Sequence, residues 1–385
     1  MSTYTVRFED NNQEIVFTGV MRPRATAELE DVRVVFERAL TRVSGTLNLN
    51  FKRLLKANNV AFQEMVSLFT WVCKQRPDLK VRVIVSSVVG WATRKFKVVS
   101  AISPNIQVEQ YDQVFYPGQT VLENSFVSIL RTQTKMTWRH EKDILPRHGL
   151  KEGHEVADIC CGIGDFALLM QKEFKPKRLV AIDHAKPSLE YARRVAEEFG
   201  IKEVEYIYGD ASALLLDSNQ FDFVTCRHAL QVFNRPEAIL KELFRICKPG
   251  GRVYITNEKN SQCLGEPHGE SIAWTYKEVA RLWAHFEMDI EFGPKSRRYL
   301  LDAGFNDVKM ESIMVTNMDG DPKDFADIIQ AWEDVYAGEM AVKRGDSPEF
   351  ITRFRKGFQD HIAAALHPRG YAGWPIWIAS ARKPV

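Results

Sequence analysis

Apolar residues in this chain recur with two different periods, which together predict alternating strands and helices. From residue 155 onward, short apolar runs typical of buried strands alternate with segments whose apolar residues return every three or four positions, as on one face of a helix. Regular alternation of this kind predicts a parallel sheet with helices on both faces. The predicted strands begin at Val156, Leu179, Val204, Phe221, Arg252, Val308 and Trp374, and the predicted helices between the first five span Phe166–Phe174, Glu190–Phe199 and Pro236–Cys247.

Residues 1–110 are predicted to form a smaller α/β unit of their own. Asn58 directly precedes a segment with helical periodicity, where its side chain can cap the first turn. The predicted strands are Tyr4–Phe8, Glu14–Gly19, Thr46–Phe51, Val81–Ser86 and Ile106–Glu109, with a turn at Asp10–Asn12, and the predicted helices are Ala27–Arg42, Asn58–Lys74 and Trp91–Ser100.

A linker and a helical segment separate this unit from the larger domain. Tyr111–Gly118 is predicted to be the linker, because Pro117 and Gly118 break regular structure. Val121–Arg147 is rich in helical periodicity. We therefore expect three parts, which are an α/β unit at 1–110, a linker with N-terminal helices at 111–150, and the main domain at 151–385.

Length and composition narrow the class of protein. At 385 residues the chain can form two domains with separate cores, and its 52 basic and 50 acidic residues leave a net charge of +2. This balance gives no electrostatic reason to expect nucleic acid or an anionic membrane as a partner. The six cysteines show no C-x-x-C spacing, no apolar signal segment follows Met1, and no apolar run reaches the roughly 18 residues of a membrane span. We expect a cytoplasmic protein with free thiols and no metal site.

The most informative stretch is Val156–Phe166, where an apolar strand runs into a glycine turn and then into a helix. Gly162 and Gly164 allow the backbone to approach a ligand, and the helix N-terminus presents free N–H groups. The spacing also fits the dinucleotide fingerprint, so the glycines alone leave the ligand open. Asp158 and Asp165 would repel a pyrophosphate and attract an ammonium and a sulfonium. We therefore expect S-adenosylmethionine as the cofactor and S-adenosylhomocysteine as the product.

Two further acids stand at the ends of the next two strands. Asp183 ends the second strand, where a carboxylate can accept hydrogen bonds from both ribose hydroxyls, a geometry that NAD and S-adenosylmethionine sites share. Asp210 follows the third strand and suits the exocyclic amine of adenine.

In this order the motifs resemble the class I S-adenosylmethionine-dependent methyltransferases over roughly residues 120–385. The resemblance rests on Asp158-x-Cys160-x-Gly162-x-Gly164, Asp183, Gly209-Asp210, the strand with Asp222, and the turn Lys248-Pro249-Gly250-Gly251. It implies a Rossmann-like, seven-stranded sheet whose sixth strand is parallel to the others and whose seventh is antiparallel. The cofactor-binding residues that it implies are Asp158, Cys160, Gly162 and Gly164 at the methionine end, Asp183 at the ribose, Asp210 and Ala211 at the adenine, and Arg227 after the fourth strand.

The first unit resembles the STAS domain of anti-sigma-factor antagonists in the order of its elements and in the run Gly45–Asn59. Regulated members of that family carry a phosphorylatable Ser or Thr at the head of the helix after this strand. Asn58 and Asn59 occupy that place here. The resemblance implies either a regulatory module that docks a protein partner, or a domain for homodimerisation and packing.

Two segments at the sheet edge of the glycine turn are predicted to form a helical lid over the cofactor. They are residues 263–291 after the fifth strand and residues 317–373 between the sixth and seventh strands. A lid fits a small-molecule acceptor better than a macromolecule. The candidate substrate-binding residues are Trp274, Tyr276, Trp332, Tyr336, Tyr371 and Arg369, of which Arg369 could pair a carboxylate although a loop arginine is solvated by default.

A histidine is the natural general base for a hydroxyl or amine acceptor. His228 follows the fourth strand at the edge of the sheet where the glycine turn lies, which makes it the first candidate. His268 and His285 lie in the first lid segment and are the alternatives.

Four other functions are alternatives to compare with the sequence. A nicotinamide dehydrogenase would use the same glycine turn. An arsenite or thiol methyltransferase would use soft thiolates from Cys160, Cys161, Cys226 and Cys263. A regulatory protein would sense S-adenosylmethionine and act through the STAS-like unit without turnover. A nucleic-acid methyltransferase would need a basic, aromatic face and an Asn/Asp-Pro-Pro-Tyr/Phe motif after the fourth strand, and the sequence shows neither.

Overall fold

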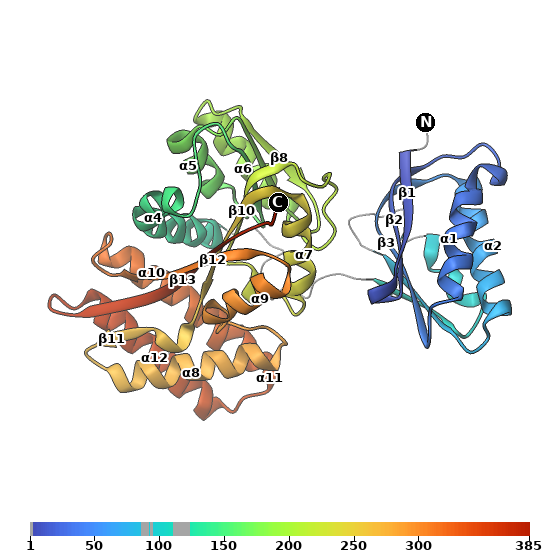
Figure 1. The fold of residues 1–385 in the computed structure, drawn as a ribbon. Coiled ribbons are helices and arrows are strands. Elements are labelled where there is room, and N and C mark those ends of the chain that lie inside the picture. The colour runs from blue at the N-terminus through green and yellow to red at the C-terminus, as the bar shows by residue number, and fades with distance from the viewer. Residues whose placement is uncertain (1–2, 86–91, 93–94, 111–123) are drawn as a thin grey trace. The chain divides into compact units, whose positions relative to one another are not determined.

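The computed structural model of the protein describes residues 3–85, 92, 95–110 and 124–385, which fall into two compact units (Figure 1). The first unit is made mainly of residues 1–112 and the second mainly of residues 113–385. The predicted linker Tyr111–Gly118 and part of the predicted helix Trp91–Ser100 lie outside the described residues.

The first unit is a five-stranded sheet in the order β1-β2-β3-β4-β5. The β1–β2 pair is an antiparallel hairpin, and β2 to β5 are parallel. Figure 1 shows α1 and α2 packed on the same face of this sheet. The bounds are β1 (Thr3–Glu9), β2 (Glu14–Met21), β3 (Thr46–Ala57), β4 (Lys80–Val85), β5 (Ile106–Gln110), α1 (Glu30–Leu40) and α2 (Asn59–Gln75), with 3₁₀ turns at Asp10–Asn12, Thr26–Leu29 and Val99–Ala101.

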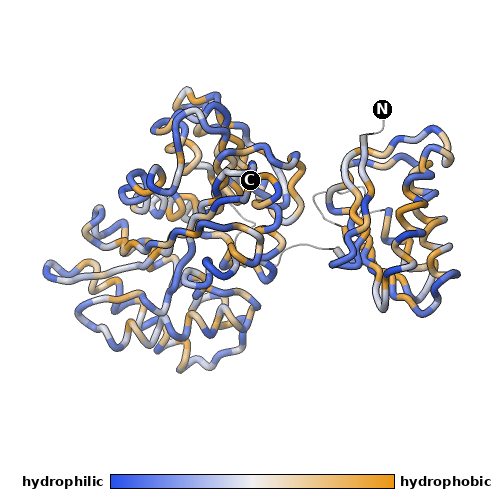
Figure 2. Tube along the Cα trace, in the orientation of Figure 1, coloured by the Kyte–Doolittle hydropathy of each residue, from blue (hydrophilic) through white to orange (hydrophobic). Residues whose placement is uncertain are grey.

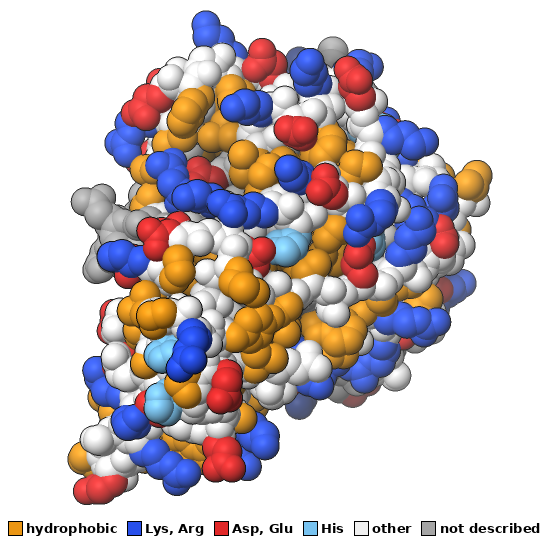
Figure 3. All heavy atoms as spheres, turned by 90° about the vertical axis from the view of Figure 1, so that its left-hand side faces the viewer, with side chains coloured by type: hydrophobic (Ala, Val, Ile, Leu, Met, Phe, Trp, Pro, Cys, Tyr) orange, Lys and Arg blue, Asp and Glu red, His pale blue; other side chains and the backbone are white. Residues whose placement is uncertain are grey.

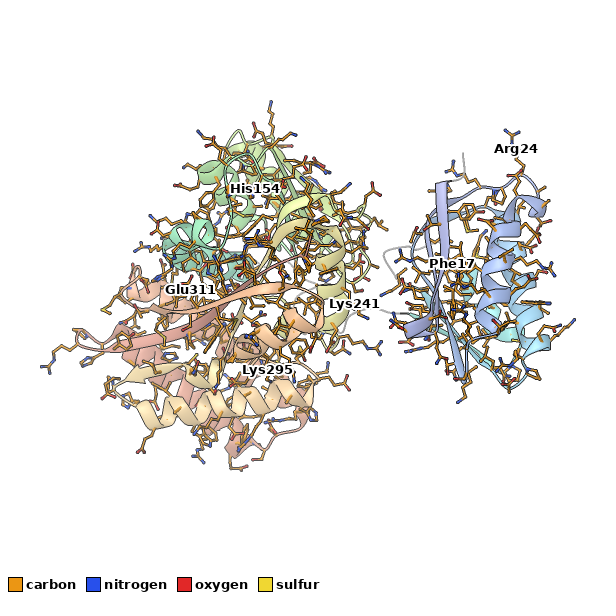
Figure 4. The ribbon with its side chains drawn as sticks, in the orientation of Figure 1. Phe17, Arg24, His154, Lys241, Lys295 and Glu311 are labelled. Carbon is orange, nitrogen blue, oxygen red and sulfur yellow. The ribbon has the colours of Figure 1, made fainter. Side chains whose placement is uncertain are left out.

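A cluster of phenylalanines forms the core of the first unit. Phe17 on β2 is fully buried and stacks on Phe51 of β3 with ring centroids 4.2 Å apart, and Figure 4 shows Phe17 between the sheet and the helices. In Figure 2 the hydrophobic stretches of this unit gather between the sheet and α1 and α2. The predicted cap is confirmed, because the Asn58 side chain accepts a 3.0 Å hydrogen bond from the Ala61 N–H.

The second unit is built on one mixed sheet in the order β8-β7-β6-β9-β10-β13. Strands β6 to β10 are parallel, β13 is antiparallel to β10, and β12 and β11 both pair with β13. The predicted parallel sixth and antiparallel seventh strands are therefore confirmed as β12 and β13. The bounds are β6 (Glu155–Ile159), β7 (Arg178–Asp183), β8 (Val204–Tyr208), β9 (Phe221–Arg227), β10 (Cys247–Glu258), β11 (Leu264–Glu266), β12 (Asn306–Thr316) and β13 (Tyr371–Arg382).

Helices cover this sheet, and a further helical layer follows its C-terminal part. Figure 1 shows α8, α11 and α12 together below β13, where α12 packs against both α8 and α10. The bounds are α4 (Asn124–Arg147), α5 (Asp165–Phe174), α6 (Lys186–Glu198), α7 (Pro236–Ile246), α8 (Gly269–His285), α9 (Ser296–Asp302), α10 (Pro322–Glu333), a π-helix (Asp334–Met340), α11 (Ala341–Arg344) and α12 (Pro348–Leu366), with 3₁₀ turns at Leu230–Val232, Asn260–Gln262 and Gly293–Lys295.

The structure corrects several predicted boundaries. The Lys248–Gly251 turn belongs to β10, because Cys247 already pairs with Phe221 and the register shifts before Arg252 pairs with Phe223. Proline and glycine here produce a bulge inside a strand rather than a separate turn before it. The helix predicted from Glu190 begins earlier, at Lys186, because Pro187 suits the first turn of a helix.

Across the residues that the structure describes, no helix combines the length and the apolar character needed to cross a membrane.

Candidate functional site

The carboxyl ends of β6, β7 and β9 meet at one edge of the parallel sheet, and a cavity opens there. Its walls come from the glycine turn after β6, the residues after β7, the loop after β9 and one face of α4. Asp158, Gly162, Asp183, Arg227 and His228 all line it. The fold therefore brings together residues from three separate strands that the sequence had predicted to share a site.

The glycine turn depends on left-handed backbone conformations. Gly162 has φ 55° and Gly164 has φ 77°, and Cys160 adopts φ 61° despite its side chain. A Cβ on Gly164 would come within 2.8 Å of the Ala192 Cβ and of the Tyr206 ring. Gly164 is thus required both by its conformation and by the close packing of α6 and β8 against the turn.

Asp158 carries the clearest sign of a missing cationic partner. Its side chain is buried at 2% exposure, and one carboxylate oxygen accepts a 2.6 Å hydrogen bond from the Thr225 hydroxyl. The other oxygen, Oδ2, is buried without a hydrogen-bond partner among the described residues. Burial raises the pKa of Asp158 to about 6. A carboxylate held in this way fits the ammonium group of S-adenosylmethionine, which would supply the missing donor.

Asp165, the second acid of the turn, has a different environment. Arg131 of α4 donates a 3.0 Å hydrogen bond to its carboxylate and forms an ion pair with it. The charge of Asp165 is therefore offset by α4, and the selection of a cationic ligand at the turn rests on Asp158.

Asp183 fixes the turn as well as lining the cavity. Its two carboxylate oxygens accept hydrogen bonds from the Gly162 N–H at 2.8 Å and from the Ala185 N–H at 2.9 Å. Each oxygen retains a lone pair, so the carboxylate can also accept from ribose hydroxyls. Asp183 thus couples the position of the glycine turn to the end of β7.

Asp210 and Ala211 are not among the described residues that line the cavity. The Gly209 N–H donates to the Asp183 carbonyl at 3.0 Å, which keeps the end of β8 beside the end of β7. Asp210 is buried, and it accepts hydrogen bonds from the Ser212 N–H at 2.8 Å and from the Ser212 hydroxyl at 2.7 Å. The predicted adenine residues lie next to the cavity rather than in its wall.

Arg227 lines the cavity, but its hydrogen bonds go to α4. Its guanidinium forms a buried ion pair with Glu141, donates to the Thr137 hydroxyl at 3.0 Å, and lies 3.8 Å from the Phe166 ring centroid. Burial by itself would raise the pKa of Glu141, but Arg227 outweighs it and holds that pKa below its usual range. Arg227 therefore holds α4 over the cavity, and no pattern in the sequence pointed to its partner Glu141.

His228 is held in a strained conformation at the end of β9. Its φ is 50°, and its N–H donates to the Thr256 carbonyl on β10 at 2.8 Å. Ring atom Nδ1 lies 2.7 Å from Glu258 Oε1, and Nε2 is buried without a partner among the described residues. Strain of this kind is concentrated at functional sites. Glu258 is a site residue that the sequence analysis missed.

Four of the predicted substrate-binding aromatics belong to one cluster of rings in the helical layer. Trp374 lies 5.7 Å from His228 and 5.3 Å from Trp332, which lies 6.3 Å from Tyr276. Phe358 lies 5.7 Å from Tyr276 and 6.1 Å from Tyr336. Phe354 lies 5.1 Å from Phe358 and 6.4 Å from Trp274, so the cluster extends to that ring as well.

The last two candidates lie at the start of β13. Arg369 is exposed in the preceding loop, and Tyr371 pairs with Glu266 of β11. None of the six substrate-binding candidates, and no other residue of 263–291 or 317–373, is among the described residues that line the cavity. Its cover is instead α4, through Leu130, Gln133 and Thr134.

The cysteines near the turn are poorly suited to thiolate chemistry. A contact with the Cys226 thiol, together with burial, raises the pKa of Cys160 well above its usual range. Burial, together with nearby carboxylates, does the same for Cys161 and for Cys263. Since the thiolate is the reactive form, these thiols are poor nucleophiles, and Cys160 and Cys161 serve as small side chains of the cavity wall.

Comparison with known proteins identifies the class of enzyme. The family described as methyltransferase domain matches residues 156–251. A demethylmenaquinone methyltransferase from Oceanobacillus iheyensis is 27% identical over 203 residues, which cover 49% of this chain and 84% of that protein. A demethylmenaquinone methyltransferase from Listeria welshimeri is 31% identical over 198 residues, which cover 47% of this chain and 82% of that protein. A solved structure of a SAM dependent methyltransferase from Aquifex aeolicus is 22% identical and covers 51% of this chain and 94% of its own, with a TM-score of 0.40.

The family match includes the glycine turn, Asp183, Asp210 and the strand that ends before His228. The Listeria welshimeri protein exceeds 30% identity over most of its length. The chain therefore belongs to the S-adenosylmethionine-dependent methyltransferases, and S-adenosylmethionine is its cofactor.

Proposed function

We propose that the protein transfers a methyl group from S-adenosylmethionine to a small-molecule acceptor, with His228 as the general base. The observation that carries this proposal concerns two buried atoms on residues of one cavity wall, Asp158 Oδ2 and His228 Nε2. Neither has a hydrogen-bond partner among the residues that the structure describes. A carboxylate oxygen suits the cofactor ammonium, and a neutral ring nitrogen suits the proton that the acceptor loses.

Different side chains are proposed to bind the cofactor and to accept the proton. S-adenosylmethionine supplies the activated methyl group on its sulfonium. Asp158 would hold the ammonium, Asp183 the ribose, and Asp210 with Ala211 the adenine, as the family resemblance implies. His228 would accept the proton of the acceptor. Burial of these groups strengthens their electrostatic effects, because little water is present to screen them.

The acceptor is proposed to be a small molecule that enters beside a lid made by α8, α10 and α12. The row from His228 through Trp374 to Trp332 extends from the cavity wall into this helical layer, and it suits an aromatic acceptor. In Figure 3 basic and acidic side chains are interspersed on the face of the molecule that is shown, unlike a nucleic-acid-binding surface of one charge. Demethylmenaquinone, the substrate in the names of the relatives, is the first acceptor to test.

The first unit is proposed to be a STAS-like module at residues 1–110 that docks a protein partner or forms a homodimer. Its support is the sheet order with α1 and α2 on one face, and the position of Asn58 as the cap of α2. Sedimentation of the full chain at several concentrations would distinguish a dimer from a monomer that binds other proteins.

The alternative functions are less well supported. The family assignment rejects a nicotinamide dehydrogenase. Methylation of arsenite or thiols would need reactive thiolates, but the pKa values of Cys160, Cys161 and Cys263 are raised well above the usual range. A protein that only senses S-adenosylmethionine would not need a histidine with a free ring nitrogen at the cavity.

The decisive experiment follows a labelled methyl group. The full chain is incubated with methyl-labelled S-adenosylmethionine and demethylmenaquinone in its reduced, hydroxylated form, and with extracts of small molecules in parallel. We expect label in an extractable product and one S-adenosylhomocysteine per methyl transferred. Binding of S-adenosylmethionine without any release of S-adenosylhomocysteine would instead identify a sensor.

A further inference from the structure

The pairing of β9 and β10 places two residues distant in sequence side by side. The strands are parallel with Arg227 opposite Thr256, so His228 leaves β9 where Glu258 ends β10. The His228 N–H then continues the ladder by donating to the Thr256 carbonyl at 2.8 Å. The sheet itself thus sets the distance between the imidazole and the Glu258 carboxylate.

Burial and backbone hydrogen bonds also fix the position of Glu258 at the end of β10. It is 5% exposed, and its backbone N–H donates to Gln231 Oε1 at 2.8 Å. Gln231 is also buried, and its backbone carbonyl accepts from the Asp289 N–H at 2.9 Å. These hydrogen bonds fix the backbone of Glu258 at the end of β10. Its buried carboxylate places Oε1 on the His228 ring, and Oε2 has no partner among the described residues.

The chemistry of the contact determines the tautomer of the ring. Glu258 Oε1 lies 2.7 Å from His228 Nδ1, and a carboxylate accepts hydrogen bonds but donates none. Nδ1 must therefore carry the proton in the neutral ring, and Nε2 must carry the lone pair. Nε2 is buried without a partner in the described part of the chain, and His228 lines the cofactor cavity.

We propose that Glu258 is a positioning residue, which holds His228 in the tautomer whose Nε2 accepts the proton of the methyl acceptor. This inference rests on the proposed function. An electron pair of the acceptor forms the bond to the methyl carbon, and the electron pair of the broken carbon–sulfur bond stays on sulfur in S-adenosylhomocysteine. The acceptor proton moves to Nε2 and later leaves to solvent. Glu258 stabilises the resulting imidazolium, because its negative charge lies next to Nδ1.

The tautomer can be measured without any methyl acceptor. The full chain is labelled with ¹⁵N-histidine and bound to S-adenosylhomocysteine, and the His228 signals are assigned by their loss in His228→Asn. We expect a protonated Nδ1 and an unprotonated Nε2 in the neutral ring of the natural protein. In Glu258→Leu, which removes the acceptor, we expect the other tautomer to become populated. A protonated Nε2 in the natural protein, or an unchanged tautomer in Glu258→Leu, overturns the proposal.

Kinetics then separate positioning from a merely structural role. Glu258→Gln should lower kcat about tenfold or more while the KM for S-adenosylmethionine stays within about twofold. The double variant His228→Asn with Glu258→Gln should be no slower than His228→Asn alone, because the two residues act as one unit. Glu291→Gln is the matched control, since Glu291 accepts a 2.7 Å hydrogen bond from the Ser261 N–H in a nearby loop.

The outcomes distinguish the two proposals. An unchanged kcat in Glu258→Gln, or additive effects in the double variant, overturns the role of Glu258. Absence of methyl transfer in the natural protein with every acceptor overturns the proposed function instead. The nitrogen spectra would still report whether Glu258 sets the tautomer.

Discussion

Asp158 and Thr225 form a buried 2.6 Å hydrogen bond across β6 and β9, at the point where β6 enters the glycine turn. The Thr225 hydroxyl satisfies only one oxygen of the carboxylate, and the other has no partner within the described ranges. Burying half of a carboxylate without a donor is unfavourable in the free protein. In the proposed complex, cofactor binding would remove this cost, because the ammonium group would pair with the second oxygen.

Asp158→Asn should weaken cofactor binding without loss of folding. A hydrogen bond to a charged group contributes about 1.5–3 kcal/mol, so we expect affinity for S-adenosylhomocysteine to fall about 10- to 150-fold by titration calorimetry. Asp217→Asn is the control, because Asp217 is exposed. Equal affinity in Asp158→Asn and in the control would show that another group holds the ammonium.

Asp158 should also give the cofactor-free protein a specific pH dependence. Because burial raises its pKa from 3.8 to about 6, protonation stabilises the folded state, and this stability is lost as the pH rises from about 4 to about 6. At pH 7 the shift corresponds to about 3 kcal/mol. In urea unfolding, Asp158→Asn should therefore gain stability relative to the natural protein between pH 4.5 and pH 7. A constant difference between the two proteins over this range would contradict the assignment.

Cofactor affinity should change with pH in the opposite sense to stability. The ammonium pairs with the ionised carboxylate, so affinity for S-adenosylhomocysteine should rise as the pH increases through about 6 and then level off. Asp158→Asn should lose this dependence, which calorimetry at several pH values will show. The same rise in the variant would assign the titration to another residue.

The ion pair between Glu141 and Arg227 should be the main attachment of α4 to the sheet. Glu141→Gln leaves a buried guanidinium without its counter-charge, which typically costs about 3–5 kcal/mol, so we expect a large fall in unfolding free energy and faster amide exchange in α4. Lys135→Ala on the same helix removes an exposed 3.4 Å pair with Asp324 and should change stability by less than about 1 kcal/mol. Similar losses of unfolding free energy in both variants would show that the buried ion pair contributes no more to stability than the exposed one.

The two glycines of the turn should respond differently to alanine. Gly162→Ala places a Cβ where no described atom lies within 4 Å, so it should cost only the left-handed backbone strain of about 1–2 kcal/mol. Gly164→Ala adds a clash with Ala192 and Tyr206, which should raise the total to about 2–5 kcal/mol. Thermal unfolding of the two variants side by side measures this difference. Equal melting temperatures would contradict the close packing at Gly164.

His228→Ala tests the proposed base directly. Cofactor affinity should change little, because the groups proposed to hold the cofactor remain, while kcat should fall about 10²- to 10⁴-fold. Comparison with His154→Ala, a histidine that precedes β6 at the end of the strand away from the glycine turn, controls for removal of an imidazole. Unchanged turnover in His228→Ala would eliminate it as the base.

Local patterns were sufficient for most of the fold. The strands near Val156 and Leu179 are short, mostly apolar runs, and the helices that follow them show one apolar face, so period and spacing identify both. The order of the last two strands followed from the family resemblance. Short elements were missed, such as β11, because three residues that pair with β13 carry no pattern of their own.

The residues of the site also fall into two groups, those that the sequence indicated and those that only the structure identified. The glycine turn, Asp158, Asp183 and His228 could be found because each stands directly after a predicted strand, and parallel strands end at a common edge. Their partners could not be found. Thr225, Glu141 and Glu258 are separated from Asp158, Arg227 and His228 by 67, 86 and 30 positions, and only strand pairing and helix packing bring them into contact.

The sequence by itself thus determined the class of protein and its cofactor, because spacing along a strand and turn is a local property. Only the tertiary structure decided the burial and the charge and hydrogen-bond partners of each group. It left one oxygen of Asp158 without a partner among the described residues, paired Asp165 and Arg227 with side chains of α4, and placed Glu258 beside the ring of His228. Burial, charge pairing and tautomer depend on neighbours that are distant in sequence, which no pattern along the chain records.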